Sequence, residues 1–130
     1  SSAESIPAGA PTDDAALAEM RAGVRFPAEF SFNDWRPRGV VQAELDRMVD
    51  KLGHCPDRIR VTGHSDQKGT DWANDTFALA RAGEVRRILG TRGIDRRRIE
   101  VTSSGSADPE ADADTPEGRA YNRRVIVRCY

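Results

Sequence analysis

The feature that most constrains this sequence is the alternation of helical apolar stripes with short strand-like segments. Two stripes stand out, and each is bounded by residues that begin or end helices. The first predicted helix opens at Pro37, ends at Gly53 and carries these apolar residues: Val41, Leu45, Met48, Val49 and Leu52. The second begins near Asp71, stops at Gly93 and carries these: Ala78, Ala82, Val85 and Leu89.

Four segments show the apolar alternation that is typical of strands, at residues 26–32, 58–63, 98–103 and 124–130. The first is accepted as a strand despite Pro27. Thr115 and Pro116 look like the cap and first turn of a short helix before the last strand. Helical connections predict parallel pairing of the first three strands, with the last strand antiparallel among them. We therefore expect an α/β two-layer sandwich, in the order βαβαβ(α)β, with a mixed four-stranded sheet and helices on one face.

The length of 130 residues fits one domain with a modest core. Residues 1–12 are rich in Ser, Ala and Pro, and 13–22 can form a short helix. We therefore predict a flexible lead-in at 1–23 and a folded domain at 24–130. The net charge of −1 provides no bulk attraction to nucleic acid or membrane, and no apolar run reaches transmembrane length. Because the chain starts without Met, we expect a mature or cut fragment.

The most distinctive local pattern joins the second strand to the helix that follows it. Asp66 comes just after the strand, Arg81 lies within the helix, and Asn74 lies between them. A carboxylate and a guanidinium at such a junction can bind a zwitterion, the first through its ammonium and the second through its carboxylate. The alternative is that Asp66 and Arg81 simply pair with each other as a structural ion pair.

Several motifs in register carry a family resemblance. They are Thr62-Gly63-His64-Ser65-Asp66-x-x-Gly69, Phe77-Ala78-x-x-Arg81-Ala82, and Glu117-Gly118-Arg119-Ala120-Tyr121-Asn122-Arg123-Arg124-Val125. Together they resemble the OmpA-like C-terminal domain, the peptidoglycan-binding module of outer-membrane proteins, peptidoglycan-associated lipoproteins and flagellar stator proteins. The resemblance covers roughly residues 26–130, and each motif alone would be a weak signal.

The resemblance implies a module without catalytic activity, cofactor or metal, which binds the diaminopimelate of peptidoglycan stems. Asp66 would accept from the ligand ammonium, Arg81 would hold its carboxylate and Asn74 would support the stem. The remaining implied site residues are Arg123 at the rim, Thr62 and Gly63 through their backbone, and Phe30 and Ser31 in the first strand. The expected location is the periplasmic face of the cell envelope, associated with the outer membrane. The expected partner is peptidoglycan, other envelope proteins and a homodimer are left open, and no nucleic acid or membrane insertion is expected.

Two departures from the family pattern keep a second hypothesis open. Ser31 stands where the family often has Asp, and Ala78 replaces a common Ser. A module of the same fold that does not bind peptidoglycan would serve protein interaction or dimerisation. A third hypothesis, a polyanion binder, depends on a cluster of arginines: Arg86, Arg87, Arg92, Arg96, Arg97 and Arg98. Such a cluster is usually a solvated face balanced by nearby acids, here Glu84, Asp95 and Glu100.

Cys55 and Cys129 match neither a Cys-x-x-Cys pair nor a zinc pattern. Cys55 precedes the second predicted strand, and Cys129 lies at the end of the fourth. If these strands are antiparallel neighbours, the two cysteines lie near enough to bridge. We therefore predict a Cys55–Cys129 disulfide, which fits an oxidising periplasm, with two buried free thiols as the alternative.

Overall fold

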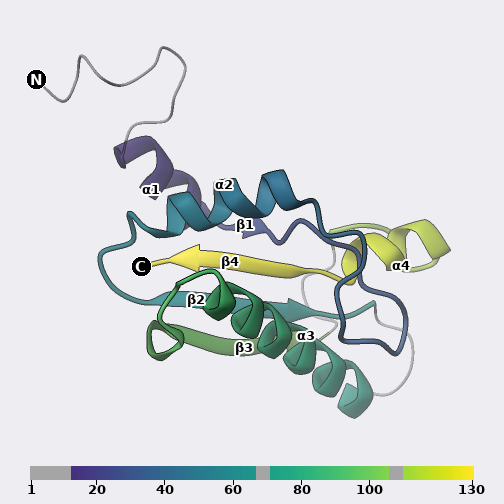
Figure 1. Cartoon of the computed structure of the whole chain (residues 1–130). Helices are drawn as coiled ribbons and strands as arrows, with labels where there is room; N and C mark the ends of the chain where they lie inside the picture. The colour runs from purple at the N-terminus through teal and green to yellow at the C-terminus, as the bar shows by residue number, and fades with distance from the viewer. Residues whose placement is uncertain (1–12, 67–70, 106–109) are drawn as a thin grey trace, which may run out of the picture.

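The computed structural model describes residues 13–66, 71–105 and 110–130 (Figure 1). The helices are α1 (Asp13–Ala22), α2 (Gln42–Leu52), α3 (Asp71–Thr91), the short 3-10 helix η2 (Arg96–Arg98) and α4 (Pro116–Asn122). The strands are β1 (Val24–Arg25), β2 (Ile59–His64), β3 (Ile99–Gly105) and β4 (Val125–Cys129). Among the described residues, no helix is both long enough and apolar enough to span a bilayer.

The strands form one mixed sheet in the order β1-β4-β2-β3. β2 pairs in parallel with β3, and antiparallel with β4, so that Val61 lies opposite both Val101 and Val127. The prediction of an antiparallel last strand is therefore confirmed. The prediction that the first strand pairs in parallel is wrong, because β4 lies between β1 and β2 and β1 pairs antiparallel with β4.

The predicted first strand at 26–32 is also wrong in extent, since β1 ends at Arg25. The amide of Phe26 still donates to the Val125 carbonyl at 2.8 Å, but the next amide on that side, of Ala28, turns back to the Phe26 carbonyl at 2.8 Å and so leaves the ladder. The chain then bends, and Phe26 and Phe30 both turn into the core. Their spacing imitates strand alternation although the backbone between them is irregular.

The helix expected to open at Pro37 begins instead at Gln42, after Val41 as its N-cap. Arg38 is held in an isolated antiparallel bridge with Glu29, with two backbone hydrogen bonds of 2.8 Å, and Gly39 after it has a positive φ of 61°, so the helix cannot start at Pro37. Val41, predicted to be in the apolar stripe, is exposed. The rest of the prediction holds, because Leu45, Met48 and Leu52 are buried and Gly53 ends the helix.

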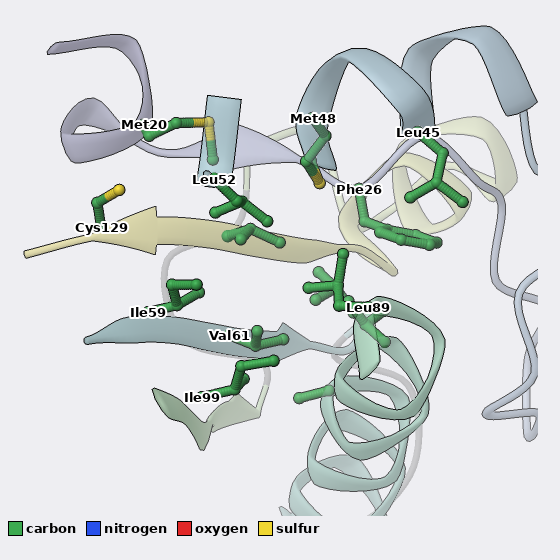
Figure 2. Close-up of a cluster of buried hydrophobic side chains, with 14 of the residues drawn as sticks. Met20, Phe26, Leu45, Met48, Leu52, Ile59, Val61, Leu89, Ile99 and Cys129 are labelled. Atoms are coloured by element: carbon green, nitrogen blue, oxygen red, sulfur yellow. The ribbon is translucent and has the colours of Figure 1, made fainter. Parts of the chain in front are cut away.

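One core lies between the sheet and the helices (Figure 2). It combines side chains of β2 and β4 with those of α2 and α3: Ile59, Val61, Val125, Val127, Leu45, Met48, Leu52, Val85 and Leu89. Met20 of α1 is fully buried in the same cluster, so α1 packs onto the domain. The domain boundary at residues 23 and 24 stays a prediction. The opposite sheet face carries polar residues such as Arg60, Thr62 and Arg128, which confirms the two-layer α/β sandwich.

Two covalent or capping features match the sequence predictions. Cys55 and Cys129 form a disulfide with a Cα–Cα distance of 5.8 Å, which ties the turn after α2 to the end of β4. At α4, the Thr115 hydroxyl accepts from the amide of Gly118 at 3.0 Å, and Pro116 occupies the first turn. Residues 1–12, and with them most of the predicted lead-in, lie outside the described residues.

Candidate functional site

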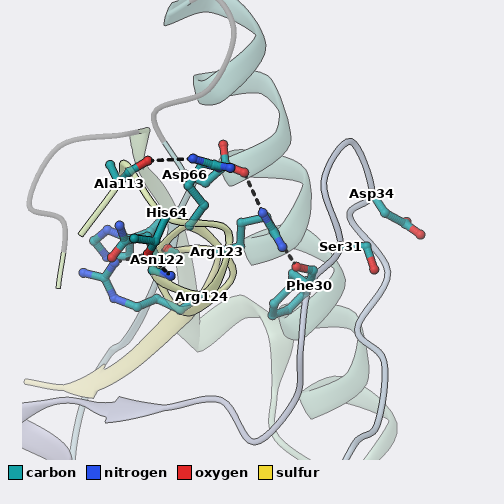
Figure 3. Close-up of polar contacts among 12 residues, drawn as sticks. Phe30, Ser31, Asp34, His64, Asp66, Ala113, Asn122, Arg123 and Arg124 are labelled. Carbon is teal, nitrogen blue, oxygen red and sulfur yellow. Dashed lines mark hydrogen bonds and ion pairs between the residues drawn. The ribbon is translucent and has the colours of Figure 1, made fainter. Parts of the chain in front are cut away.

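Asp66 lies two residues beyond the end of β2 and is almost fully buried, with 2% of its surface exposed. Its Oδ2 accepts a hydrogen bond from Nη1 of Arg123 at 2.6 Å (Figure 3). Arg123 is the C-cap residue of α4, so this ion pair joins the end of β2 to the end of the last helix. A carboxylate held in this way is positioned before any ligand arrives.

Arg81, in the middle of α3, is equally buried at 2% exposure. Its three guanidinium nitrogens each donate to a backbone carbonyl: Nε to Asp34 at 2.9 Å, Nη1 to His64 at 3.2 Å and Nη2 to Ser31 at 3.0 Å. Burial first, and then repulsion by Arg123, lowers the pKa of Arg81 to about 10, while Asp66 and Asp34 oppose the shift. Arg81 therefore remains a cation at neutral pH, in an environment where its charge is poorly solvated.

The alternative of a simple Asp66–Arg81 ion pair does not describe this arrangement. Asp66 is paired with Arg123, whereas Arg81 is bonded to carbonyl groups from the end of β2 and from the loop after Phe30. The two charges are nevertheless close enough for Asp66 to stabilise the Arg81 cation. Asp66, Arg81 and Arg123 thus form one buried cluster of charged side chains, which we call the charged cluster.

Arg123 is central to this cluster, although the sequence suggested only a place at the rim. Besides its bond to Asp66, its Nε donates to the carbonyl of Phe30 at 2.6 Å. Figure 3 shows these contacts as a continuous chain from Asp66 through Arg123 to Phe30. Arg123 therefore connects the carboxylate to the loop that begins at Phe30.

A surface groove of about 410 Å³ opens beside the charged cluster. Three predicted site residues line it, namely Phe30, Ser31 and Arg123. The rest of its lining comes from β1, the following loop and α4: Arg25, Glu29, Glu117, Ala120 and Tyr121. Because Arg123 lines the groove and also contacts Asp66, the groove and the charged cluster meet at this side chain.

Asn74, Thr62 and Gly63 occupy different surroundings. Asn74 is buried in the first turns of α3. The Thr62 hydroxyl lies 3.0 Å from that of Thr102, on the sheet face away from the core. Gly63 permits close packing, since a Cβ there would lie 1.7 Å from the carbonyl oxygen of Ala78. Their roles toward a ligand stay predictions.

Asn122 is a structural residue of this region to which the sequence analysis assigned no role. It is fully buried, and its Oδ1 accepts from the amides of Glu110 and Ala111, both at 2.8 Å. Its Nδ2 donates back to the Ala111 carbonyl at 2.9 Å. Asn122 thus holds the loop before α4 beside Arg123. The only sequence feature that could have pointed to this role is its place in the family motif at residues 117–125.

The arginine cluster near the end of α3 is largely engaged with acids and carbonyls. Arg87 pairs with Glu84 and Arg97 with Asp95, which are two of the three acids that the sequence analysis expected to balance this cluster. Arg86 donates to the Arg96 carbonyl, and Arg98 to the carbonyls of Cys55 and Asp57. Glu100 pairs instead with Arg58, just before β2, and with Arg60 of β2. These contacts are typical of a solvated, charge-balanced face.

A comparison with models of protein families finds one match, over the central part of the chain. Residues 40–123 match the OmpA family, a match that covers more than half of the chain. The chain belongs to the OmpA family. The matched range contains Asp66, Arg81 and Arg123, whereas it excludes the disulfide residue Cys129.

Among curated relatives of this OmpA-family chain is the peptidoglycan-binding protein ArfA of Mycobacterium tuberculosis, 42% identical over 84 residues. That alignment covers 64% of this chain but only 26% of ArfA. The peptidoglycan-associated lipoprotein of Pseudomonas aeruginosa is 32% identical over 120 residues, covering 92% of this chain and 68% of the lipoprotein. The chain therefore spans about a quarter of the length of ArfA and two thirds of that lipoprotein.

Solved structures agree with this assignment. The peptidoglycan-associated lipoprotein from Burkholderia pseudomallei superposes with a TM-score of 0.71 at 28% identity, covering 79% of this chain and 88% of that one. The cell wall anchor of the T6SS from Pseudomonas aeruginosa has a TM-score of 0.66 at 27% identity, covering 92% and 97%.

Proposed function

We propose that this chain is a non-catalytic module that binds peptidoglycan through the diaminopimelate of its peptide stems. In this role it anchors an envelope protein or assembly to the cell wall, on the periplasmic side and in association with the outer membrane. The names of its relatives, a peptidoglycan-binding protein and a peptidoglycan-associated lipoprotein, support the proposal. The attachment of a longer protein to the cell wall through this module is part of the same proposal.

The charge balance of the charged cluster is the observation that carries the proposal. Two guanidinium groups, Arg81 and Arg123, accompany one carboxylate, Asp66, and all three are largely removed from water. The lowered pKa of Arg81 reflects burial and the repulsion between the two cations. A ligand carboxylate would offset that repulsion, and the adjacent Asp66 carboxylate would attract the ligand ammonium.

The hydrogen-bonding capacity of Arg81 supports the same assignment. Each terminal nitrogen of a guanidinium carries two N–H groups. Because Nη1 and Nη2 each use one group on a carbonyl, each retains one further donor. Two donors on neighbouring nitrogens suit a carboxylate, which can accept both at once. Diaminopimelate in a stem keeps one amino-acid centre free, so it offers both the carboxylate and the ammonium that the charged cluster would bind.

Retention on purified sacculi tests the proposal directly. We expect Asp66→Asn, which keeps the size of the side chain but removes its charge, to lower retention by about tenfold or more, since a charged hydrogen bond is lost. A stem peptide that carries diaminopimelate should compete with the wild type, whereas the same peptide with lysine in that position, which has a free ammonium but no free carboxylate, should not. Thermal unfolding of each variant separates ligand loss from unfolding. Equal retention of wild type and Asp66→Asn would refute the site.

A second candidate function is a protein-interaction or dimerisation module of the same fold. The observation that favours it is the burial of Arg81, whose guanidinium already stabilises three carbonyls without any ligand. If this function is correct, the wild type is not retained on sacculi above background, and for a dimerisation module sedimentation shows a concentration-dependent dimer.

A further inference from the structure

The loop whose residues Phe30 and Ser31 line the groove also exposes two aromatic side chains, Phe32 and Trp35. The amide of Asp34 donates to the Ser31 carbonyl at 3.2 Å, which closes a turn, and Asn33 within it has a positive φ of 54°. Phe32 lies at the tip of this turn and Trp35 directly follows it, and each is 45% exposed. We call Phe32 and Trp35 the aromatic pair.

The turn is held by the arginines that build the charged cluster. Arg81 donates to the carbonyls of Ser31 and Asp34, and Arg123 donates to that of Phe30. The backbone of the turn that carries the aromatic pair is therefore held in place by the charged cluster. A ligand that contacts both places would meet a surface ordered in advance, which lowers the entropy cost of binding.

Large aromatic side chains exposed on the loop that borders a groove are a common sign of an interaction surface. Polar side chains accompany this pair on the loop. Arg36 lies with its guanidinium over the Trp35 ring, 5.4 Å from the ring centre, and its Nε lies 3.3 Å from Asp34 Oδ1. Arg38 Nη1 donates to the Ser31 hydroxyl at 3.1 Å. An apolar ring face bordered by donors and acceptors complements a sugar ring, which has C–H faces and hydroxyl edges.

We propose that the aromatic pair contacts the glycan strand, so that the domain binds sugar and peptide stem together. This proposal rests on the proposed function of the charged cluster. Asp34 partly balances Arg36 and Arg38, so the loop lacks the run of basic residues that draws a protein to an anionic membrane. Because stem and glycan are covalently linked, the second contact becomes intramolecular and multiplies the affinity of the first.

The decisive experiment compares two soluble ligands by calorimetry: a diaminopimelate stem peptide, and the same stem attached to its disaccharide. We expect the wild type to bind the second about tenfold more tightly, within the range of a single aromatic contact. Trp35→Ala should bind both ligands with the affinity of the wild type for the bare stem. Tyr130→Ala is the matched control, because Tyr130 is 43% exposed but lies beside Arg58, at the opposite end of β2 from Asp66.

Two variants separate this proposal from the proposed function. Asp66→Asn should weaken both ligands, and if it weakens neither, the stem site itself is refuted. If the wild type binds both ligands equally, or if Trp35→Ala keeps the tenfold preference, the glycan contact is refuted while the stem site stands.

Tryptophan fluorescence tests which ligand contacts the aromatic pair. Trp72→Phe leaves Trp35 as the sole tryptophan of the chain, which has two. Its emission should shift to shorter wavelength with the disaccharide ligand and not with the stem alone. A shift produced instead by anionic phospholipid vesicles, or by raising the protein concentration, would overturn the assignment to glycan in favour of a membrane or a second copy.

Discussion

The Asp66 carboxylate and the Arg123 guanidinium, 57 residues apart in sequence, meet at 2.6 Å with their side chains 3% and 14% exposed. Removing one partner of a buried pair leaves the other charge poorly compensated. We therefore expect Arg123→Met to lower the free energy of unfolding by about 3 kcal/mol. Urea denaturation measures this loss.

The matched control for that variant is Lys51→Met. Lys51 of α2 pairs with Glu19 of α1 at 2.8 Å, where the side chains are 20% and 47% exposed. Solvent-exposed pairs contribute roughly 1 kcal/mol or less, so this substitution should be much milder. Equal losses for the two variants would contradict the buried ion pair as the source of stability.

Alanine substitutions at two glycines should have opposite effects on stability, because one glycine is needed for close packing and the other only lowers helix propensity. Gly63→Ala would place a Cβ 1.7 Å from the Ala78 carbonyl oxygen, forcing α3 away from β2, and we expect a loss of at least about 2 kcal/mol. Gly83→Ala, within α3, meets nothing within 4 Å and should stabilise the protein by about 0.5–1 kcal/mol. Thermal unfolding of both variants checks the prediction, which fails if the two substitutions shift stability in the same direction.

The Cys55–Cys129 disulfide closes a loop with a sequence separation of 74. In the chain-entropy account, a loop of this length contributes about 4 kcal/mol. The double variant Cys55→Ser/Cys129→Ser should have a free energy of unfolding lower by that amount, and it should therefore unfold at a lower denaturant concentration. Reductant should no longer affect its stability. Mass analysis after alkylation of the unreduced wild type should find no reactive thiol; two labelled thiols would exclude the bridge.

The pH dependence of ligand binding should follow the cation at Arg81. Its pKa is lowered to about 10, chiefly by burial, so the group keeps its proton at neutral pH and loses it as the pH rises through that value. The protonated form is the one that attracts a carboxylate. Calorimetry with a diaminopimelate peptide should therefore show no change due to Arg81 from pH 6 to 8, and weaker binding above about pH 10. Stronger binding at high pH would reverse the assigned role.

Local patterns in the sequence predicted the parts of the fold whose signal is local. The stripes of α2 and α3 were predicted because each buries one helical face, and the cap at Thr115 because its motif is three residues long. The same reasoning gave a wrong prediction for the segment at 26–32, which is not a continuous strand. Phe26 and Phe30 are buried, but the chain between them bends at Pro27, and apolar spacing alone does not distinguish these cases.

The candidate site shows the same division between residue identity and arrangement. The family motifs identified Asp66, Arg81 and Arg123 as residues to consider. They did not reveal that Arg81 would bind carbonyls 47 and 50 residues away, or that Arg123 would be the ion-pair partner of Asp66. Such contacts depend on how distant loops pack, which no local spacing records.

By itself, the sequence determined the family, the helices and strands with strong periodicity, and the chemistry available near the end of β2. Only the tertiary structure decided that β4 lies between β1 and β2, and that the loop after Phe30 folds over Arg81. The physical reason is that backbone carbonyls and buried charges must find partners wherever the packed chain supplies them, irrespective of their distance along the sequence.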